Sequence, residues 1–162
     1  MKTIKNLLLP LCLFCSIWVQ GQTRIKEIFQ GNNSSEPKYF TSVGGINYFF
    51  DKQNFLYKTD GTELGTVLLT DPNNSSFVFP TITFVESSNV GNKLVFSAYQ
   101  TNDYKGDELW VSDGTTSGTI EIKDINPGTS DSNPGEFIPL ENGYTVFNAT
   151  VNFERQVWVT DG

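Results

Sequence analysis

The sequence predicts an all-β protein: a β-propeller-like array of four-stranded antiparallel sheets, or blades. A motif containing Asp-Gly recurs, since Asp60, Asp113 and Asp161 are 53 and 48 residues apart. Periods of about 40–50 residues with several short strands each are typical of propeller blades. Tight-turn residues also separate short runs rich in aromatic and β-branched residues, and no stretch after residue 21 keeps a helical periodicity.

Composition excludes several classes of function. The chain of 162 residues has the length of one ordinary domain, and its 14% aromatic residues suffice for a core. It has no histidine, which excludes Ser-His-Asp and Cys-His catalysis and histidine-ligated zinc or haem. A net charge of −7 disfavours nucleic acid and anionic lipid, so we expect no nucleic-acid partner.

Residues 1–21 have the pattern of a secretory signal peptide. Lys2 and Lys5 precede the apolar run Leu7–Val19, and the small residue Gly21 suits the last position before cleavage. The alternative is a membrane anchor, which is disfavoured because the run is short and polar sequence follows at once. We therefore expect a secreted or outer cell-surface protein with no membrane span once the leader is removed.

Both cysteines, Cys12 and Cys15, lie inside this leader. A lipoprotein cysteine is disfavoured because Phe14, rather than a small residue, precedes Cys15. The predicted mature chain, residues 22–162, is thus exported yet free of disulfides, which is more typical of a bacterial β protein than of a small animal ectodomain.

The mature chain divides into an isolated strand and three repeats. The isolated strand is Arg24–Ile28, and the repeats span about 38–71, 77–125 and 136–162, the last truncated before its fourth strand. Turns of the Gly-Gly, Gly-Asn and Asn-Gly type join the first two strands of each repeat. The predicted strands, in order within the three repeats, are Lys38–Val43, Ile46–Asp51, Phe55–Thr59 and Thr66–Thr70; Phe77–Phe84, Lys93–Tyr99, Glu108–Ser112 and Thr119–Lys123; and Glu136–Leu140, Tyr144–Thr150 and Gln156–Thr160.

A gapless alignment of residues 25–50 with residues 122–147 supports these limits. It pairs Ile25 with Ile122 and Phe50 with Phe147, so the isolated strand corresponds to a fourth strand. The count is about three blades, fewer than the four to eight of a typical propeller. We therefore expect either an incomplete piece of a larger array or a three-bladed closure with Arg24–Ile28 beside Gln156–Thr160.

The repeated turn between the third and fourth strands favours a structural role. Aspartate accepts hydrogen bonds from nearby amides, and glycine tolerates positive φ. A ligand or metal site is the alternative, but the same residues recur in the repeats, whereas a catalytic residue is usually singular. The predicted turn residues are Asp60, Gly61, Thr62, Gly65, Asp113, Gly114, Thr115, Gly118 and Asp161.

Aromatic residues occupy one position of the third strand in every repeat, namely Tyr57, Trp110 and Trp158. Sheet-to-sheet core is the favoured interpretation, because both faces of a middle blade are covered by neighbours. Sugar stacking on these rings is the alternative.

The segment ELWVSDGTTSGT at Glu108–Thr119, with its partial copy YKTDGTELGT at Tyr57–Thr66, resembles the ELWxxDGTxxGT (hyalin-like) repeat. This family occurs in long secreted proteins of Gram-negative bacteria, many of which end in a type IX secretion sorting domain. The first copy departs from the motif because Tyr57 replaces tryptophan. The resemblance implies an extracellular β-propeller-like array and supplies no catalytic residues.

Three acidic residues are candidates for ligand or Ca²⁺ binding, namely Asp103, Asp107 and Asp131. Oxygen ligands suit Ca²⁺, but the spacing does not match the D-x-D-x-D-G loop. Solvated loop charge is the alternative, so we assign no metal site and no cofactor.

These observations predict a non-catalytic binding module for an extracellular glycan or protein. One alternative is a propeller glycosidase or lyase with paired carboxylates, for which Asp103 and Asp107 are the candidates. The other is a calcium-dependent adhesin. We expect any ligand at the face made by the loops that follow the second and fourth strands.

Overall fold

The computed structural model describes residues 22–29, 31, 33–53, 55–69, 77–78, 86–100 and 105–162. These residues contain strands and turns without a helix, which confirms the all-β prediction. In this part of the chain, no helix has the length and apolar character needed to cross a membrane. The predicted leader at 1–21 and the candidate ligand Asp103 lie outside the described residues.

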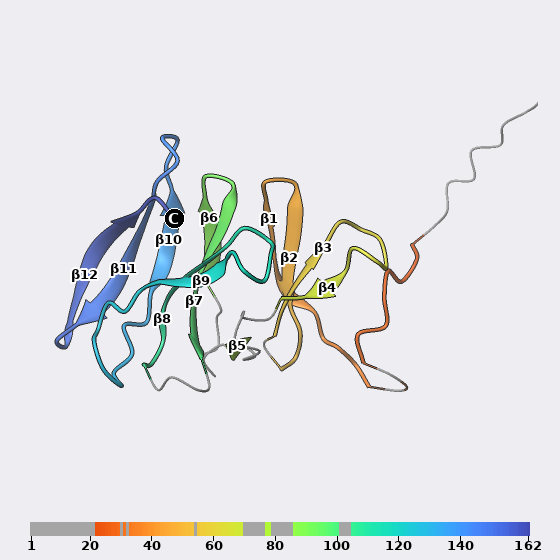
Figure 1. Cartoon of the computed structure of the whole chain (residues 1–162), viewed down its shortest axis with the longest axis horizontal. Helices are drawn as coiled ribbons and strands as arrows, with labels where there is room; N and C mark the ends of the chain where they lie inside the picture. Colours follow the sequence, from red (N-terminus) through yellow and green to blue (C-terminus); the bar gives the residue numbers. More distant parts are fainter. Residues whose placement is uncertain are drawn as a thin grey trace, which may run out of the picture.

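The first repeat forms a four-stranded antiparallel sheet in the order β1-β2-β3-β4 (Figure 1). Alternating apolar positions and the tight Gly44-Gly45 turn, with both glycines at positive φ, explain its first hairpin. Its strands coincide with the predicted ones to within a few residues: β1 (Lys38–Val43), β2 (Ile46–Phe50), β3 (Leu56–Thr59) and β4 (Val67–Leu68).

The second sheet has a divided first strand. Both β5 and β6 pair with the same edge of β7, where Val78 is opposite Tyr99 and Ser87 is opposite Phe96. The predicted single strand Phe77–Phe84 is therefore wrong in extent: the strand before the turn is Ser87–Val90, and 79–85 lie outside the described residues. The strands are β5 (Phe77–Val78), β6 (Ser87–Val90), β7 (Lys93–Gln100), β8 (Glu108–Ser112) and β9 (Thr119–Lys123).

The third sheet has the order β10-β11-β12, in agreement with the three strands predicted for the third repeat. Its strands are β10 (Gly135–Pro139), β11 (Thr145–Val151) and β12 (Glu154–Thr160). The pairing of β11 with β12 is continuous from Thr145 opposite Thr160 to Val151 opposite Glu154.

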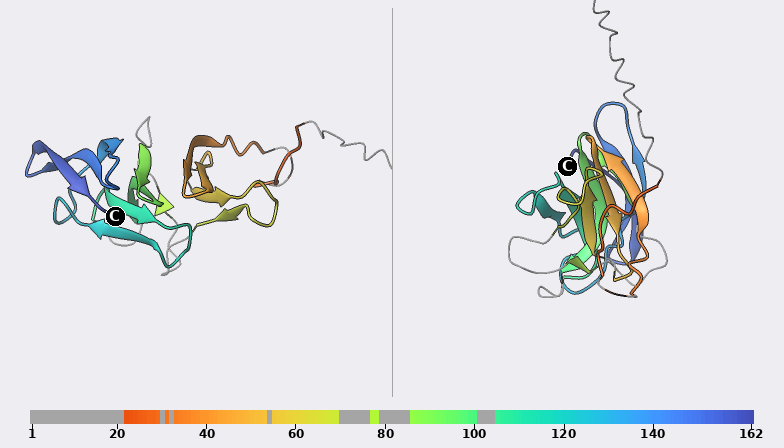
Figure 2. Two further views of the ribbon diagram at one scale, coloured as in Figure 1. Left: turned by 90° about the horizontal axis from the view of Figure 1, so that it is seen from above. Right: turned by 90° about the vertical axis from the view of Figure 1, so that its right-hand side faces the viewer.

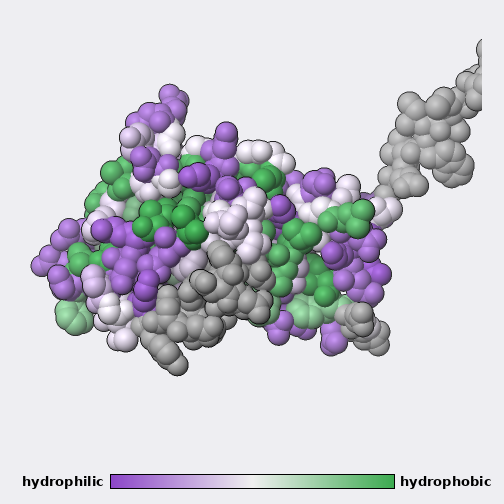
Figure 3. Space-filling view, in the orientation of Figure 1, coloured by the Kyte–Doolittle hydropathy of each residue, from purple (hydrophilic) through white to green (hydrophobic). Residues whose placement is uncertain are grey.

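The sheets stack face to face, and the second sheet is buried on both faces. One face carries Phe96 and Trp110, which pack with Tyr48, Phe50 and Leu56 of the first sheet. The other face carries Val95, Leu109 and Val111, which pack with Phe147 and Ala149 of the third sheet. Apolar surface remains visible over the first and third sheets in Figure 3. Trp110 therefore belongs to the sheet-to-sheet core, as predicted.

The first strands of the three sheets lie close together. Close contacts between sheets join β6 to β1 on one side and to β10 on the other. The hydroxyls of Thr41 and Ser87 are 2.9 Å apart across the first of these contacts. Seen from above, β1, β6 and β10 run along one side of the stack (Figure 2). The described strands form separate sheets rather than a closed ring.

The isolated strand predicted at Arg24–Ile28 is wrong, because these residues form no strand. They lie against the first sheet, where the Lys26 Nζ donates to the carbonyl of Thr66 at 2.7 Å. The predicted closure beside Gln156–Thr160 is also wrong, since β12 is at the opposite end of the stack (Figure 1). A strand needs the edge of a partner, and two intervening sheets separate this segment from the edge of β12.

The gapless repeat alignment is shifted by one residue in the second strand. Phe147 is opposite Trp158, and the residue opposite Tyr57 in the first sheet is Phe49 rather than Phe50. The turn before β11 is longer than the turn before β2, so residues that are equivalent in the first strands fall out of step by one position in the second strands. Since side chains alternate between the faces of a strand, one residue decides which face a phenylalanine covers.

Candidate functional site

The Asp-Gly-Thr turns hold themselves together. In the second repeat the Asp113 Oδ1 accepts from the Thr115 amide at 2.8 Å and from its hydroxyl at 2.7 Å. The Thr115 hydroxyl oxygen accepts in turn from the Gly118 amide at 2.9 Å. The hydrogen bond from the threonine side chain is the largest cause that lowers the pKa of Asp113, and Asp60 is lowered in the same way by Thr62. Each carboxylate is thus satisfied within its own turn.

The glycines of these turns serve two different purposes. Gly61 and Gly114 have φ of +90° and +84°, as expected for glycine. Gly65 and Gly118 are needed for a different reason, which the sequence did not reveal. A Cβ on either would lie 2.0 or 2.1 Å from the aspartate Oδ1 of its turn. The carboxylate therefore packs directly on the glycine Cα.

A pair of hydroxyls closes the base of each complete turn. Thr59 and Thr66 pair at 2.7 Å in the first repeat, and Ser112 and Thr119 pair at 2.8 Å in the second. The third repeat reproduces the start of this pattern, because the amide beyond Asp161, that of Gly162, donates to the Thr160 hydroxyl at 3.1 Å. These contacts support a structural role for the turns.

Asp113→Ala is expected to lower the free energy of unfolding by about 1 kcal/mol, since the exposed amide can rehydrate. Gly118→Ala is expected to cost a similar amount, because its Cβ displaces the Asp113 carboxylate. The two losses should not add: once Asp113 is alanine, Gly118→Ala has nothing left to displace. Denaturant unfolding of both single variants and the double variant measures this, and full additivity would contradict the arrangement.

The acidic candidates lie where the chain crosses from the second sheet to the third. The Asp131 Oδ1 accepts from the Asp107 amide at 3.0 Å, so the structure brings these two predicted residues together. Ser132 continues the contact, because its hydroxyl is 2.9 Å from the Asp107 carbonyl and 2.7 Å from the Glu108 Oε2. Glu108 Oε2 also accepts from the Ile125 amide at 2.7 Å. The cluster fastens the crossover loop to the start of β8.

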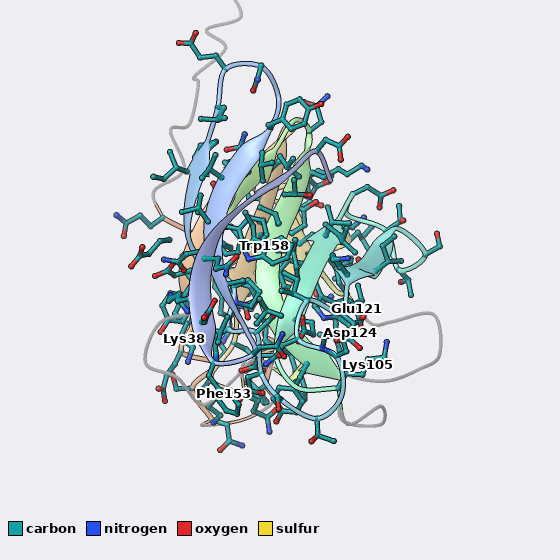
Figure 4. All side chains as sticks on the ribbon, turned by 90° about the vertical axis from the view of Figure 1, so that its left-hand side faces the viewer. Lys38, Lys105, Glu121, Asp124, Phe153 and Trp158 are labelled. Carbon is teal, nitrogen blue, oxygen red and sulfur yellow. The ribbon has the colours of Figure 1, made fainter. Side chains whose placement is uncertain are left out.

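Burial decides the electrostatics of this cluster. Asp107 is 4% exposed, and burial raises the pKa of its carboxyl to about 7, with further contributions from the charges of Asp131 and Glu108. Burial also raises the pKa of Glu108, while its bond from Ser132 lowers it. At the rim of this region the Lys105 Nζ pairs with the Glu121 Oε2 at 3.1 Å (Figure 4). Asp107 is therefore a buried acid rather than solvated loop charge.

This cluster has no geometry for a metal ion in the described part of the chain, where no group of three or more potential ligands is suitably arranged. Asp103, the third candidate, falls outside that part. Calcium binding through Asp103 stays a prediction.

A groove of about 310 Å³ lies where the first strands converge. The aromatic residues Tyr39, Phe40 and Phe137 line it beside the exposed residues Glu86 and Glu136. The Glu86 carboxylate accepts a hydrogen bond from the Glu136 amide, which joins the second and third sheets across the groove. The groove lies at the N-terminal ends of β1, β6 and β10, and the crossover loop after β9 leads into β10 there.

Two residues of the groove hold unusual backbone angles. Tyr39 and Glu136 have φ of +56° and +54°, and each lies at a register shift in its strand. The gapless alignment already places them at the same repeat position, so the repeated bulge was a signal that sequence reasoning missed. A bulge re-aims side chains at a strand edge, and positive φ at such residues often marks functional sites.

The molecule is thus an all-β protein of stacked antiparallel sheets with a groove at their common edge. Comparison of the chain with protein-family models, with curated proteins and with solved structures finds no match.

Proposed function

We propose that this chain is a non-catalytic, exported binding module of β-propeller-like architecture whose partner is an extracellular glycan or protein. The observation that carries the proposal is the groove between the first strands. In a propeller the first strand of each blade lines the central channel, and convergence of β1, β6 and β10 is what that architecture requires. The resemblance to the ELWxxDGTxxGT repeats and the predicted leader support an extracellular location.

The chemistry of the groove favours a glycan. Binding sites combine apolar and aromatic walls with a few polar groups that fix orientation. Phe40, which is 66% exposed, supplies an aromatic ring at the groove, while Glu86 and Glu136 offer acceptors for sugar hydroxyls. A catalytic role through Asp107 is less favoured, because its carboxyl is buried at the crossover and does not line this groove.

A glycan array with the full chain tests the proposal. The variant carrying Glu86→Gln and Glu136→Gln keeps the shape of both side chains but removes their charges. We expect about a tenfold loss of affinity for any glycan bound, since a hydrogen bond to a charged group contributes about 1.5–3 kcal/mol, more than a neutral one.

Glu154→Gln is the matched control, because Glu154 is exposed in β12, two strands away from β10, and does not line the groove. Binding should persist in EDTA, whereas loss in EDTA would favour the calcium-dependent adhesin. Affinity unchanged by the double substitution, or no glycan bound at all, would reject the groove as a glycan site.

A further inference from the structure

The crossover loop, residues 124–134 between β9 and β10, is fastened to the chain just before β8. The Asp131 Oδ1 accepts from the Asp107 amide at 3.0 Å. In return, the amides of Ser132 and Asn133 donate to the Asp107 carbonyl at 2.9 and 3.2 Å. We call these contacts of Asp107 with Asp131, Ser132 and Asn133 the clasp. The clasp joins a loop that leads to the third sheet with the entry of a central strand of the second.

The clasp is packed without spare room. Gly106 has φ of +82°, and a Cβ on it would lie 2.8 Å from the Asp131 Oδ1 and 2.8 Å from the carbonyl carbon of Ser130. Contacts this short force one side to move, since protein interiors are close-packed. The backbone of the loop therefore lies directly on the chain before β8, and a side chain at position 106 fits only when the loop has moved away.

The fastened residues lead directly into the groove. The Asn133 carbonyl accepts from the Arg155 Nη1 at 3.2 Å, and Glu136, three residues further on, lines the groove. The register of β10 and β11 shifts between Gly135 and Ile138, so Glu136 has no paired residue in β11. Its amide instead donates to the Glu86 carboxylate. With few strand contacts of its own, Glu136 depends for its position on the loop that precedes it.

The buried carboxyl in the clasp has only acidic neighbours to interact with. Asp107 is 4% exposed, and its carboxyl receives no hydrogen bond from the described residues. The charges that act on it are those of Asp131 in the loop and Glu108 in β8. The nearby Lys105 is paired with Glu121 of β9. When ionised, Asp107 is therefore a desolvated charge beside the carboxylate that fastens the loop, and such a charge is costly.

We propose that the clasp is a proton-controlled closure of the crossover loop that regulates the groove. While the Asp107 carboxyl is protonated, the loop stays on the chain before β8 and Glu136 keeps its place beside Glu86. When the carboxyl ionises, the loop opens so that water reaches the charge, and the entry of β10 loses its fixed position. The consequence for glycan binding rests on the proposed function, whereas the opening of the loop does not.

The direction of the pH dependence follows from the two states of the loop. Burial in the closed state raises the pKa of Asp107 to about 7, whereas hydration in the open state returns it toward 3.8. Closure is therefore most favoured below about pH 4, weakens as pH rises to about 7, and changes no further above that. The ratio of closed to open loop falls by at most about tenfold per pH unit in this window.

Hydrogen exchange of the full chain, followed by NMR, tests the opening. The amides of Ser132 and Asn133 report on the clasp, and the amide of Leu69, which donates to the Leu56 carbonyl at 2.8 Å, reports on the first sheet. After correction for intrinsic exchange, protection of both clasp amides should fall between pH 4 and pH 7, by up to about tenfold per pH unit. It should stay below that of Leu69 at every pH, because the opening is local.

Asp107→Asn should remove most of this fall in protection, because asparagine does not ionise. Protection that does not change with pH in the parent chain would overturn the closure. So would clasp amides as protected as that of Leu69, since the loop would then open only together with the whole fold.

Gly106→Ala should open the clasp without any change of pH. At pH 5 its Cβ displaces the Asp131 carboxylate, so protection of the clasp amides should fall while the Leu69 amide stays protected. Gly143→Ala is the matched control: its φ is +83°, nearly that of Gly106, but its Cβ would have no atom within 4 Å. Equal protection of the clasp amides in the two variants would overturn the packing on which the proposal depends.

The Glu136 amide reports whether the opening reaches the groove. Its protection should fall with pH together with that of the clasp amides, and no fall would overturn the regulation of the groove. The glycan array is then run at pH 5 and pH 8. The parent should bind at least about twofold more weakly at pH 8, since affinity follows the fraction of chains with a closed loop.

Asp107→Asn should bind alike at both pH values, because its groove carboxylates are those of the parent. Equal affinity of the parent at both pH values would overturn the regulation and leave the proposed function intact. Exchange as expected without any glycan bound would support the closure and reject the proposed function.

Discussion

Replacing Asp107 with asparagine is expected to stabilise the protein at pH 8 and leave it unchanged near pH 4. The folded pKa of this buried carboxyl is raised to about 7, so ionisation opposes folding. The loss in free energy of unfolding that this ionisation causes is absent below the unfolded pKa near 3.8, and it grows as pH rises from there to about 7. The full difference between the folded and unfolded pKa of Asp107 corresponds to a loss of at most about 4 kcal/mol in the free energy of unfolding.

Denaturant unfolding between pH 4 and pH 8 measures this effect. The parent chain should lose stability as pH rises through this window, and Asp107→Asn should lose less, with a remaining slope from Glu108, whose pKa is also raised. Asp113→Asn is the control, because the ionised carboxyl of Asp113 stabilises the fold rather than opposing it. Its carboxyl has a lowered pKa, so its contribution is present above the unfolded value and is lost only as pH falls through the folded one. Equal pH profiles for the parent and Asp107→Asn would contradict the buried acid.

Phe96→Ala is expected to lower the free energy of unfolding by about 3–5 kcal/mol. Phe96 is fully buried in the cluster that joins the second sheet to the first. Its removal leaves a cavity between two sheets, and small proteins have only about 5–15 kcal/mol of stability to lose. Thermal and denaturant unfolding measure the change.

Phe153→Ala is the matched control, because Phe153 is fully exposed in the turn between β11 and β12. We expect a change of no more than about 0.5 kcal/mol for it. A loss below 1 kcal/mol for Phe96→Ala would mean that the first two sheets do not share a core.

The sequence alone determined most strands of the three sheets and the turns that join them, although not Arg24–Ile28 or the first strand of the second sheet. Local chemistry is sufficient there: Gly44-Gly45 permits a tight hairpin, and Asp113 and Thr115 satisfy amides only a few residues away. The burial of Trp110 was also predictable, since a repeated aromatic in a middle sheet has covered faces on both sides. The need for Gly118 was visible as a pattern, although its cause was not.

Only the tertiary structure decided the features that depend on distant segments. The sequence could not show that Arg24–Ile28 stays beside the first sheet, because a strand forms only where a partner edge is within reach. It could not place Glu86 next to Glu136, which are far apart in the chain and meet through the convergence of the first strands. Nor could it show that Asp107 is buried, since the raised pKa depends on the crossover loop folding over it. Local hydrogen bonds can be inferred from residues a few positions apart, whereas burial and charge depend on how whole sheets stack.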